Sequence, residues 1–349
     1  MTRLLVGGYS GAKGKGTGIT VLDGDEVVAT VPADSPSWLT RHPRLSVLYA
    51  VAETDEGHVH AWALEDGVPA DPLGTGATGG AEPAHLTVDP SGRFLITANY
   101  TGGSLSVHRL GSDGSIGERT DLVQHQVHGE HPRQATAHPH MILAVARPAA
   151  GSVAGAAAGS GPTGSAMPPA DAASFATAEL LVTDLGGDAI YRYWLADDGR
   201  LTLGGVMVAP KASGPRHVLP VGSRYYVTAE LSGQVLVYDA GQQLAGAIPA
   251  SATPGPNQPS ELVSDGRYLY VANRGPNTVT VFDIQHDAPR YVGEVATGDW
   301  PRHIALNDAR LYVANERSHE VTCMAIDPDT GIPAQSVTIE VPSPTHVLP

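Results

Sequence analysis

The sequence predicts an all-β protein, a seven-bladed β-propeller that forms one domain over residues 1–349. Three observations predict this fold. A phrase of residues recurs at near-constant spacing, the composition suits many short strands, and the two ends of the chain supply complementary parts of one repeat.

The composition favours strands and tight turns over long helices. The chain has 41 glycines and 28 prolines, while aromatic residues make up 5% and hydrophobic residues 42%. Such a chain can bury a core, and its turn residues are frequent enough to connect many short strands.

Charge and hydropathy exclude several classes of partner. The formal net charge is −15 and no cluster of Lys and Arg is present, so we expect no nucleic-acid partner. No apolar run approaches the length of about 18 residues that a membrane span needs, so we expect no membrane partner. The first ten residues lack the features of a signal peptide, which predicts a cytoplasmic location. Cys323 is the one cysteine, and its alternating surroundings predict a core position.

The repeated phrase begins with Pro-x-His, continues through apolar runs and a turn, and ends on a small residue followed by a polar one. Pro301-Arg302-His303, for example, leads to Tyr312-Val313-Ala314-Asn315. An alternating strand such as Thr278-Val279-Thr280-Val281 follows each unit. The polar residues that end the units are Glu53, Asn99, Asp184, Glu230, Asn273 and Asn315.

The spacing of these polar residues matches a four-stranded propeller blade. Successive gaps are 46, 85, 46, 43 and 42 residues, and only the second is irregular. That gap contains residues 148–178, a stretch rich in Ala, Gly, Ser and Pro, which we expect to be a flexible loop inserted into one blade.

The two ends of the chain complete a seventh blade. Pro344-Thr345-His346 supplies a Pro-x-His strand near the C-terminus, and residues 4–9 supply the strand that should follow it. Pairing these strands closes the ring and removes exposed sheet edges.

The Pro-x-His position forms a ring around the axis of the predicted propeller. Five histidines are expected there, which packing alone explains poorly. The ring members are Trp38, His85, His140, His217, Glu261, His303 and His346.

Two further polar sets accompany this ring. The residues that end each unit form a second layer, in which the asparagines are expected to be turn formers and Glu230 is the exception. Arginines near the axis of an acidic protein need an anionic partner, either an internal carboxylate or a ligand. These arginines are Arg133, Arg216, Arg274 and Arg302.

The sequence contains no nucleophile elbow, and its glycine-rich loop at residues 11–16 joins two predicted strands rather than preceding a helix. We therefore expect no cofactor and no metal. The combination of His, Glu and Arg does suit the activation of water at an ester-like carbonyl.

These motifs resemble those of the propeller lactonase family, which includes bacterial 6-phosphogluconolactonases of the propeller type and carboxy-muconate cyclases. The resemblance covers nearly the whole chain. Its carriers include Ser35-Pro36-Ser37-Trp38-Leu39, Asp89-Pro90-Ser91-Gly92-Arg93, Gly214-Pro215-Arg216-His217, Ala229-Glu230-Leu231 and Val271-Ala272-Asn273-Arg274-Gly275.

The resemblance implies a seven-bladed fold, lactone chemistry and a catalytic set of His140, Arg216, Glu230 and Arg274. The ring argument adds His85, His217, Arg302 and His303 as candidate substrate-binding residues. Ala137 stands where the family usually has proline, and Ala52 stands where it usually has asparagine.

We expect hydrolysis of a sugar lactone, 6-phosphogluconolactone by resemblance, with Glu230 or His140 activating water and Arg216 and Arg274 holding the anionic groups. Replacing any of the four singly should reduce turnover and leave the fold intact. The expected partner is a small anionic lactone, and the expected state is a monomer or weak homo-oligomer.

Three alternatives stay open at this point. One is a lactone-forming cyclase acting on a muconate-type diacid. Another is a lactonase that holds Ca²⁺ through the layer of Glu53, Asn99, Asp184 and Glu230. The last is a propeller without catalytic activity that binds a partner on one face.

Overall fold

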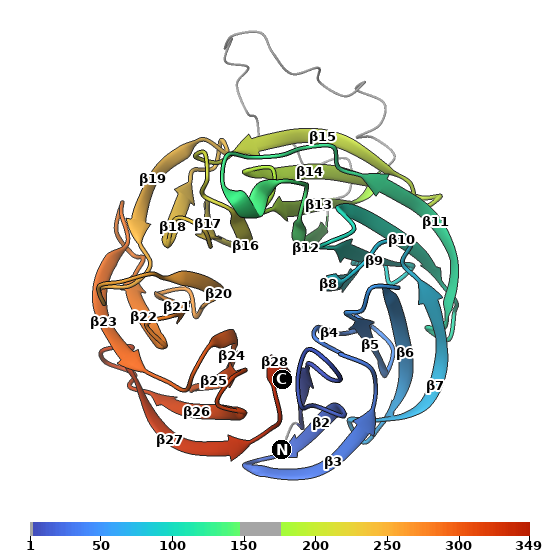
Figure 1. Ribbon diagram of the computed structural model, residues 1–349, viewed down its shortest axis with the longest axis horizontal. Helices are drawn as coiled ribbons and strands as arrows, with labels where there is room; N and C mark the ends of the chain where they lie inside the picture. The colour runs from blue at the N-terminus through green and yellow to red at the C-terminus, as the bar shows by residue number, and fades with distance from the viewer. Residues whose placement is uncertain (1–2, 147–175) are drawn as a thin grey trace, which may run out of the picture.

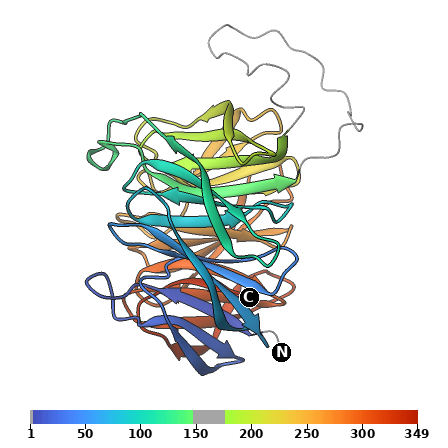
Figure 2. The ribbon, with the colours of Figure 1, turned by 90° about the vertical axis from the view of Figure 1, so that its right-hand side faces the viewer.

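The computed structural model describes residues 3–146 and 176–349 and confirms the seven-bladed β-propeller (Figure 1). Within these residues, four-stranded antiparallel sheets follow one another around a central axis (Figures 1 and 2). In six sheets the strands run in chain order from the axis outward, and in the seventh the order is β28-β1-β2-β3.

The strand bounds of the blade at the chain ends and of the next two blades are as follows. They comprise β28 (Pro344–Leu348), β1 (Leu4–Gly8), β2 (Gly18–Asp23), β3 (Glu26–Pro32); β4 (Leu39–Arg41), β5 (Val47–Ala52), β6 (His58–Glu65), β7 (Val68–Ala77); β8 (Pro83–Val88), β9 (Phe94–Asn99), β10 (Ser104–Leu110) and β11 (Ile116–Gln124).

The remaining four blades follow the short 3₁₀ helix η1 (Pro132–Gln134). They comprise β12 (Pro139–Ala146), β13 (Ala176–Asp184), β14 (Ala189–Ala196), β15 (Leu201–Val208); β16 (Pro215–Val221), β17 (Arg224–Ala229), β18 (Gln234–Tyr238), β19 (Leu244–Pro249); β20 (Gln258–Ser264), β21 (Tyr268–Arg274), β22 (Thr278–Asp283), β23 (Arg290–Ala296); β24 (Pro301–Asn307), β25 (Arg310–Asn315), β26 (Glu320–Ile326) and β27 (Pro333–Glu340).

The two ends of the chain close the ring as the sequence predicts. Strand β28 pairs antiparallel with β1, with Leu5 opposite Leu348 and Gly7 opposite His346. The hydroxyl of Thr345 also donates a hydrogen bond of 2.9 Å to the carbonyl of Ser37 at the neighbouring blade. The first and last strands therefore share one blade, and no sheet edge faces the gap between the termini.

The core lies between adjacent blades, where the apolar faces of neighbouring sheets pack together. Strand β5 shows the pattern that produces this packing, because all six of its side chains are buried between two blades. Cys323 is fully buried in the cluster that joins the blade of β25 to the closing blade, so its predicted core position is confirmed.

The innermost strands begin with an irregularity that directs side chains to the axis. In β16, Pro215 pairs with Ala229 and His217 with Thr228, so Arg216 is an extra residue that forms a β-bulge. The same shift occurs in β8, β12, β20, β24 and β28. A bulge of this kind places two consecutive side chains on one side of the strand.

A left-handed backbone residue precedes the proline in five of the described inner strands. These residues, with φ between 39° and 65°, are Ser35, Glu82, Gly214, Trp300 and Ser343. The left-handed residue turns the chain sharply into the inner strand, and proline then fixes the strand's first φ.

The predicted loop insertion at residues 148–178 lies outside the described residues, except for residues 176–178, which belong to β13. The strand therefore begins earlier than predicted. In the part of the chain that the structure describes, no helix has the length and apolar character required to cross a membrane.

Candidate functional site

The start of each inner strand and the end of the strand beside it place three rings of side chains around the axis. Each blade contributes one residue to the mouth ring, at or directly after the end of its second strand. This residue pairs through its backbone with the residue before the repeated proline. The members of the mouth ring are Tyr9, Glu53, Tyr100, Leu185, Glu230, Arg274 and Glu316.

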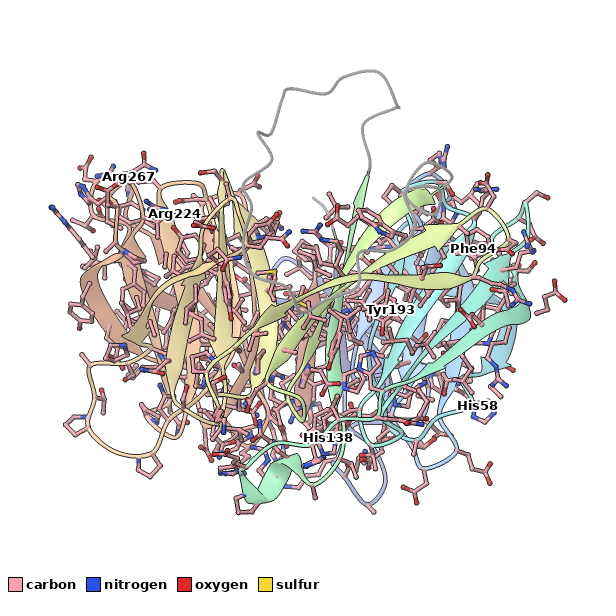
Figure 3. The ribbon with its side chains drawn as sticks, turned by 90° about the horizontal axis from the view of Figure 1, so that it is seen from above. His58, Phe94, His138, Tyr193, Arg224 and Arg267 are labelled. Atoms are coloured by element: carbon pink, nitrogen blue, oxygen red, sulfur yellow. The ribbon has the colours of Figure 1, made fainter. Side chains whose placement is uncertain are left out.

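The bulged inner strands supply the other two rings. The arginine ring consists of the residues directly after the proline: Ser37, Ala84, His140, Arg216, Ser260, Arg302 and Thr345. The histidine ring lies one residue deeper: Trp38, His85, Met141, His217, Glu261, His303 and His346. The site opens on the face that carries His138 and His58, opposite the face with Arg224 and Arg267 (Figure 3).

His140 does not belong to the histidine ring, contrary to the sequence-based expectation. Met141 pairs with Thr183 as His217 pairs with Thr228, and each of their backbone N–H groups donates to that threonine's hydroxyl at 3.1 Å. His140 therefore occupies the same ring position as Arg216. The prediction allowed only one inward ring, so it grouped His140, one residue after its proline, with side chains that lie two residues after theirs. The bulge instead turns both positions inward.

The histidine ring is packed around Trp38 below the arginine ring. The indole of Trp38 lies 4.1–5.4 Å, centroid to centroid, from the rings of His85, His217, His303 and His346. Burial lowers the pKa of all four histidines, so they are neutral at pH 7. His85, His217 and His303, which the sequence suggested as substrate-binding residues, thus lie buried in this layer.

Glu261 is the acidic member of this ring. Its Oε2 lies 2.7 Å from Nδ1 of His217 and 3.5 Å from Nε2 of His303. Burial raises the pKa of Glu261, although the charge of Arg216 opposes the shift. The carboxyl group therefore retains a proton at a pH where an exposed glutamate has lost it.

We expect Glu261→Gln to change the pH dependence of stability. Folded Glu261 holds its proton above the unfolded pKa of about 4.5, so the contribution of this one residue to stability falls as pH rises from 5 to 7, against the larger contribution of the buried histidines. Glutamine does not titrate, so the variant lacks this pH-dependent contribution to stability. The variant should gain about 1 kcal/mol per pH unit relative to wild type over that range, measured by denaturant unfolding at each pH. Parallel curves of stability against pH for the two proteins would refute this prediction.

Glu230 and three arginines form the centre of the mouth. Oε2 of Glu230 lies 2.6 Å from Nη2 of Arg274 and 3.1 Å from Nε of Arg216, and Oε1 lies 2.6 Å from Nη1 of Arg133. Residues from three separate parts of the chain thus meet on one carboxylate.

Local backbone geometry fixes the position of Arg216. Gly214 has φ of +63°, and a Cβ there would lie 2.5 Å from the side chain of Leu231, so glycine is required before this strand. Nη1 of Arg216 then donates a hydrogen bond of 2.6 Å to the carbonyl of Ser260 in the next blade. The guanidinium is held between Glu230 and a neighbouring backbone.

The electrostatic balance of this cluster is positive. Burial by itself raises the pKa of Glu230, but the three arginines lower it well below its usual range, so the carboxylate is ionised. Three guanidinium groups against one carboxylate leave an excess of two positive charges in a protein whose net charge is −15. The cluster is therefore suited to an anionic ligand.

His140 lies beside this cluster with a free ring nitrogen. Its Nδ1 is buried and has no hydrogen-bond partner, and its ring lies 5.1 Å from that of His217 and 5.5 Å from that of Tyr100. Burial, followed by the charge of Arg216, lowers the pKa of His140 well below its usual value. The imidazole is neutral at pH 7 and can accept a proton.

The opposite half of the mouth is richer in carboxylates. Glu53 accepts hydrogen bonds from the hydroxyls of Tyr9 at 2.8 Å and Ser37 at 2.5 Å. Lys13 pairs with Glu82 at 2.7 Å, and Arg302 pairs with Glu316 at 3.3 Å. Arg302, a predicted substrate-binding residue, also stacks on Tyr9.

The predicted polar layer separates into two sets. Glu53 and Glu230 belong to the mouth ring, whereas Asn99 and Asp184 lie one residue earlier and bond within their own surroundings. Asn99 donates to Ser104, and Asp184 accepts from His125 and from the backbone of His138. Among the described residues, no three His, Cys, Asp or Glu side chains converge as metal ligands would.

Sequence reasoning brought His140, Arg216, Glu230 and Arg274 to one site, and the structure places them together. It missed Tyr100, whose ring lies beside that of His140, and it missed Tyr9 and Ser37, whose hydroxyls bond to Glu53 across the mouth. Alignment of the mouth ring by backbone register would have found Tyr9 and Tyr100, because they occupy the same position as Glu230 in other blades.

A cavity of about 540 Å³ adjoins Glu230 at the mouth. Its lining consists of His131, Arg133, Glu230, Leu231, Ser232, Gly233, Pro249 and residues 251–258. The site therefore connects to a solvent-accessible space on the side of Arg133.

Comparisons with known proteins agree with this geometry. The sequence matches the family described as lactonase, 7-bladed beta-propeller, over residues 3–153 and 157–349. A 6-phosphogluconolactonase of Bacillus subtilis is 28% identical, with 90% of this chain and 86% of that protein covered. A 6-phosphogluconolactonase of Formosa agariphila is 27% identical, with 94% and 93% covered.

A solved structure shows the same architecture. The periplasmic gluconolactonase of Pseudomonas aeruginosa is 26% identical and superimposes with a TM-score of 0.82, covering 99% of this chain and 98% of that one. The match to the family extends over almost the whole sequence and agrees with the observed blades. The chain belongs to the seven-bladed β-propeller lactonase family.

Proposed function

We propose that this lactonase hydrolyses a sugar lactone that carries an anionic group, 6-phosphogluconolactone to 6-phosphogluconate. One observation carries the proposal: a neutral histidine with a free nitrogen lies beside a buried cluster with two excess positive charges. The names of the relatives from Bacillus subtilis and Formosa agariphila support the substrate.

His140 is the better candidate for the general base. Both carboxylate oxygens of Glu230 are engaged by guanidinium groups, so neither is free to take a proton from water. His140 Nδ1 has no competing partner. In this proposal Glu230 instead holds Arg216 and Arg274 in position.

His140, the two arginines and one water molecule account for every proton and bond in the proposed hydrolysis. His140 removes a proton from water as the water oxygen bonds to the lactone carbonyl carbon, and Arg216 and Arg274 stabilise the resulting oxyanion. The bond from that carbon to the ring oxygen then breaks, and the leaving oxygen takes the proton from His140. The carboxylic acid product ionises to the solvent.

The test is turnover of purified protein on 6-phosphogluconolactone, followed by comparison with His140→Gln. We expect the variant to lower kcat by about 10²–10⁴-fold, the usual contribution of a general base, with an unchanged circular dichroism spectrum. The control is His58→Gln on β6, away from the axis, which should retain wild-type kcat. Wild-type kcat in His140→Gln would exclude it as the base.

A cytoplasmic location is also part of this proposal, since the proposed substrate is a phosphorylated metabolite. The related gluconolactonase of Pseudomonas aeruginosa is described as periplasmic, so the fold itself does not decide location. Cell fractionation with an antibody to the native chain tests this point.

A further inference from the structure

Arg133 is presented to the mouth by a firmly anchored loop between β11 and β12. In η1, His131 and Gln134 form a reciprocal capping pair. Nε2 of Gln134 donates hydrogen bonds of 2.7 Å to both the carbonyl of Leu185 and Oδ1 of Asp188. The backbone at Arg133 is therefore fixed relative to the neighbouring blade.

A second contact anchors the start of the same loop. Nδ1 of His125 lies 2.6 Å from Oδ2 of Asp184, and Nε2 lies 2.9 Å from the hydroxyl of Tyr193, all in buried surroundings. Both ends of the loop are thus tied to the blade formed by β12–β15, and the guanidinium of Arg133 has a defined place.

Glu230 divides the arginines into an inner pair and an outer one. Arg216 and Arg274 bind Oε2 and have side chains only 4% and 5% exposed, whereas Arg133 binds Oε1 and is 42% exposed. Nη2 of Arg133 also lies 3.3 Å from the hydroxyl of Tyr100. The inner pair can reach only a group inserted deep in the site, while Arg133 can meet a group outside it.

The cavity beside Arg133 has the polarity that a phosphate group requires. Among the described residues that line it, Arg133 supplies a positive charge, Glu230 is the only acidic residue, and Ser232, Asn257 and Gln258 are polar but uncharged. The volume of the cavity, about 540 Å³, is ample for a tetrahedral oxyanion and the carbon that bears it.

The distribution of charge across the mouth points to the same side. The half with Arg133, Arg216, Arg274 and Glu230 has three positive groups and one negative, a sum of +2. The other charged groups around the mouth, Lys13 and Arg302 with Glu53, Glu82 and Glu316, are two positive and three negative, a sum of −1. A dianion is therefore attracted to the half that carries the cavity.

We propose that the cavity beside Arg133 is the subsite for the substrate's phosphate group, and that Arg133 makes the site prefer phosphorylated over plain sugar lactones. This inference rests on the proposed lactonase reaction, since it divides the arginines between two tasks. Arg216 and Arg274 face the reacting carbonyl, and Arg133 binds the distant phosphate by charge-assisted hydrogen bonds.

The first test compares two substrates in Arg133→Ala, the phosphorylated lactone and its unphosphorylated counterpart, glucono-δ-lactone. Loss of charge-assisted hydrogen bonds should lower kcat/KM for the phosphorylated lactone about tenfold to a hundredfold more than for the plain one, mainly through KM. Equal losses on both substrates, or no loss on either, would overturn the subsite while leaving the lactonase reaction standing.

Lys211→Ala is the matched control. Lys211 is exposed at the same rim and pairs with Glu130 of the same loop at 2.5 Å, so its replacement removes the same charge near the same segment. It does not line the cavity. The ratio of the two kcat/KM values should stay at the wild-type value in this variant. A change equal to that of Arg133→Ala would show that substrate preference depends on the overall charge near the loop and not on Arg133 in the cavity.

The second test needs no turnover. Inorganic phosphate should bind the wild-type protein and Lys211→Ala in calorimetry at low ionic strength, and at least about tenfold more weakly to Arg133→Ala. Phosphate binding that is undetectable in the wild type, or equal in all three proteins, overturns the subsite. If neither lactone is hydrolysed, the proposed function fails and the phosphate titration alone decides whether the anion site exists.

Discussion

Glu230→Gln should abolish turnover and lower the free energy of unfolding by about 3–5 kcal/mol, the usual cost of removing one partner from a buried ion pair. Glu230 neutralises two buried guanidinium groups, Arg216 and Arg274, as well as Arg133. Without it, these charges repel one another in surroundings poor in water. Activity assays and denaturant unfolding measure the two effects.

The matched control for this variant is Glu316→Gln. Glu316 occupies the same mouth-ring position in another blade, but it is 17% exposed, and among the described residues it pairs with Arg302 alone, at 3.3 Å. We expect its replacement to cost about 1 kcal/mol or less. Stability of Glu230→Gln equal to that of wild type would contradict the central role of the ion network.

This prediction revises the expectation from the sequence that each catalytic variant leaves the fold intact. Glu230 is shared by three arginines, so its loss affects packing as well as chemistry. A sulfate or phosphate ion in the buffer should restore part of the stability of Glu230→Gln, because an anion can take the place of the carboxylate.

The wild-type protein should lose about 5–10 kcal/mol of stability between pH 7 and pH 5, a loss comparable to the whole stability of many domains. Burial lowers the pKa of His85, His140, His217, His303 and His346, so these side chains stay neutral in the folded state and bind protons near pH 6.5 when unfolded.

The sign follows from proton uptake. Below pH 6.5 the unfolded chain binds more protons than the folded one, so stability is complete above that pH and falls as the solution is acidified. Arg216 and Arg302 strengthen the effect through their positive charge, whereas Glu261, protonated in the folded state, opposes it by about one proton. Denaturant unfolding at intervals from pH 7 to pH 5 measures the slope.

One variant isolates a single histidine. Burial lowers the pKa of His346 to about 3, and replacing it with leucine should reduce the acid slope by about 1.4 kcal/mol per pH unit. His286 is exposed, so His286→Gln should keep the wild-type slope. An acid slope that is the same in His346→Leu and in wild type would show that this ring does not bind protons on unfolding.

The blades and their closure could be predicted from the sequence because both depend on patterns repeated along the chain. The spacing of the Pro-x-His phrase predicted the blades, and the complementary ends of the chain predicted the pairing of β28 with β1. Ring membership at the axis could not be predicted fully. The bulge after each proline turns two consecutive residues inward, whereas the prediction allowed for one ring and therefore assigned His140 to the ring that Met141 occupies.

The partners of Glu230 show a second limit. Arg216 and Arg274 occupy repeat positions, so the phrase itself located them near the axis. Arg133 lies in an irregular loop outside the repeat, and only the three-dimensional anchoring of Gln134 and His125 brings it to the carboxylate. Sequence identified the arginine as a candidate but contained no signal for its partner.

The Trp38 side chain at the centre of the histidine ring also has a consequence for the cohesion of the fold. Its indole lies against imidazoles from β8, β16, β24 and β28, and the blades of β16 and β24 do not border the blade of Trp38. One side chain at the axis therefore joins blades that share no sheet face.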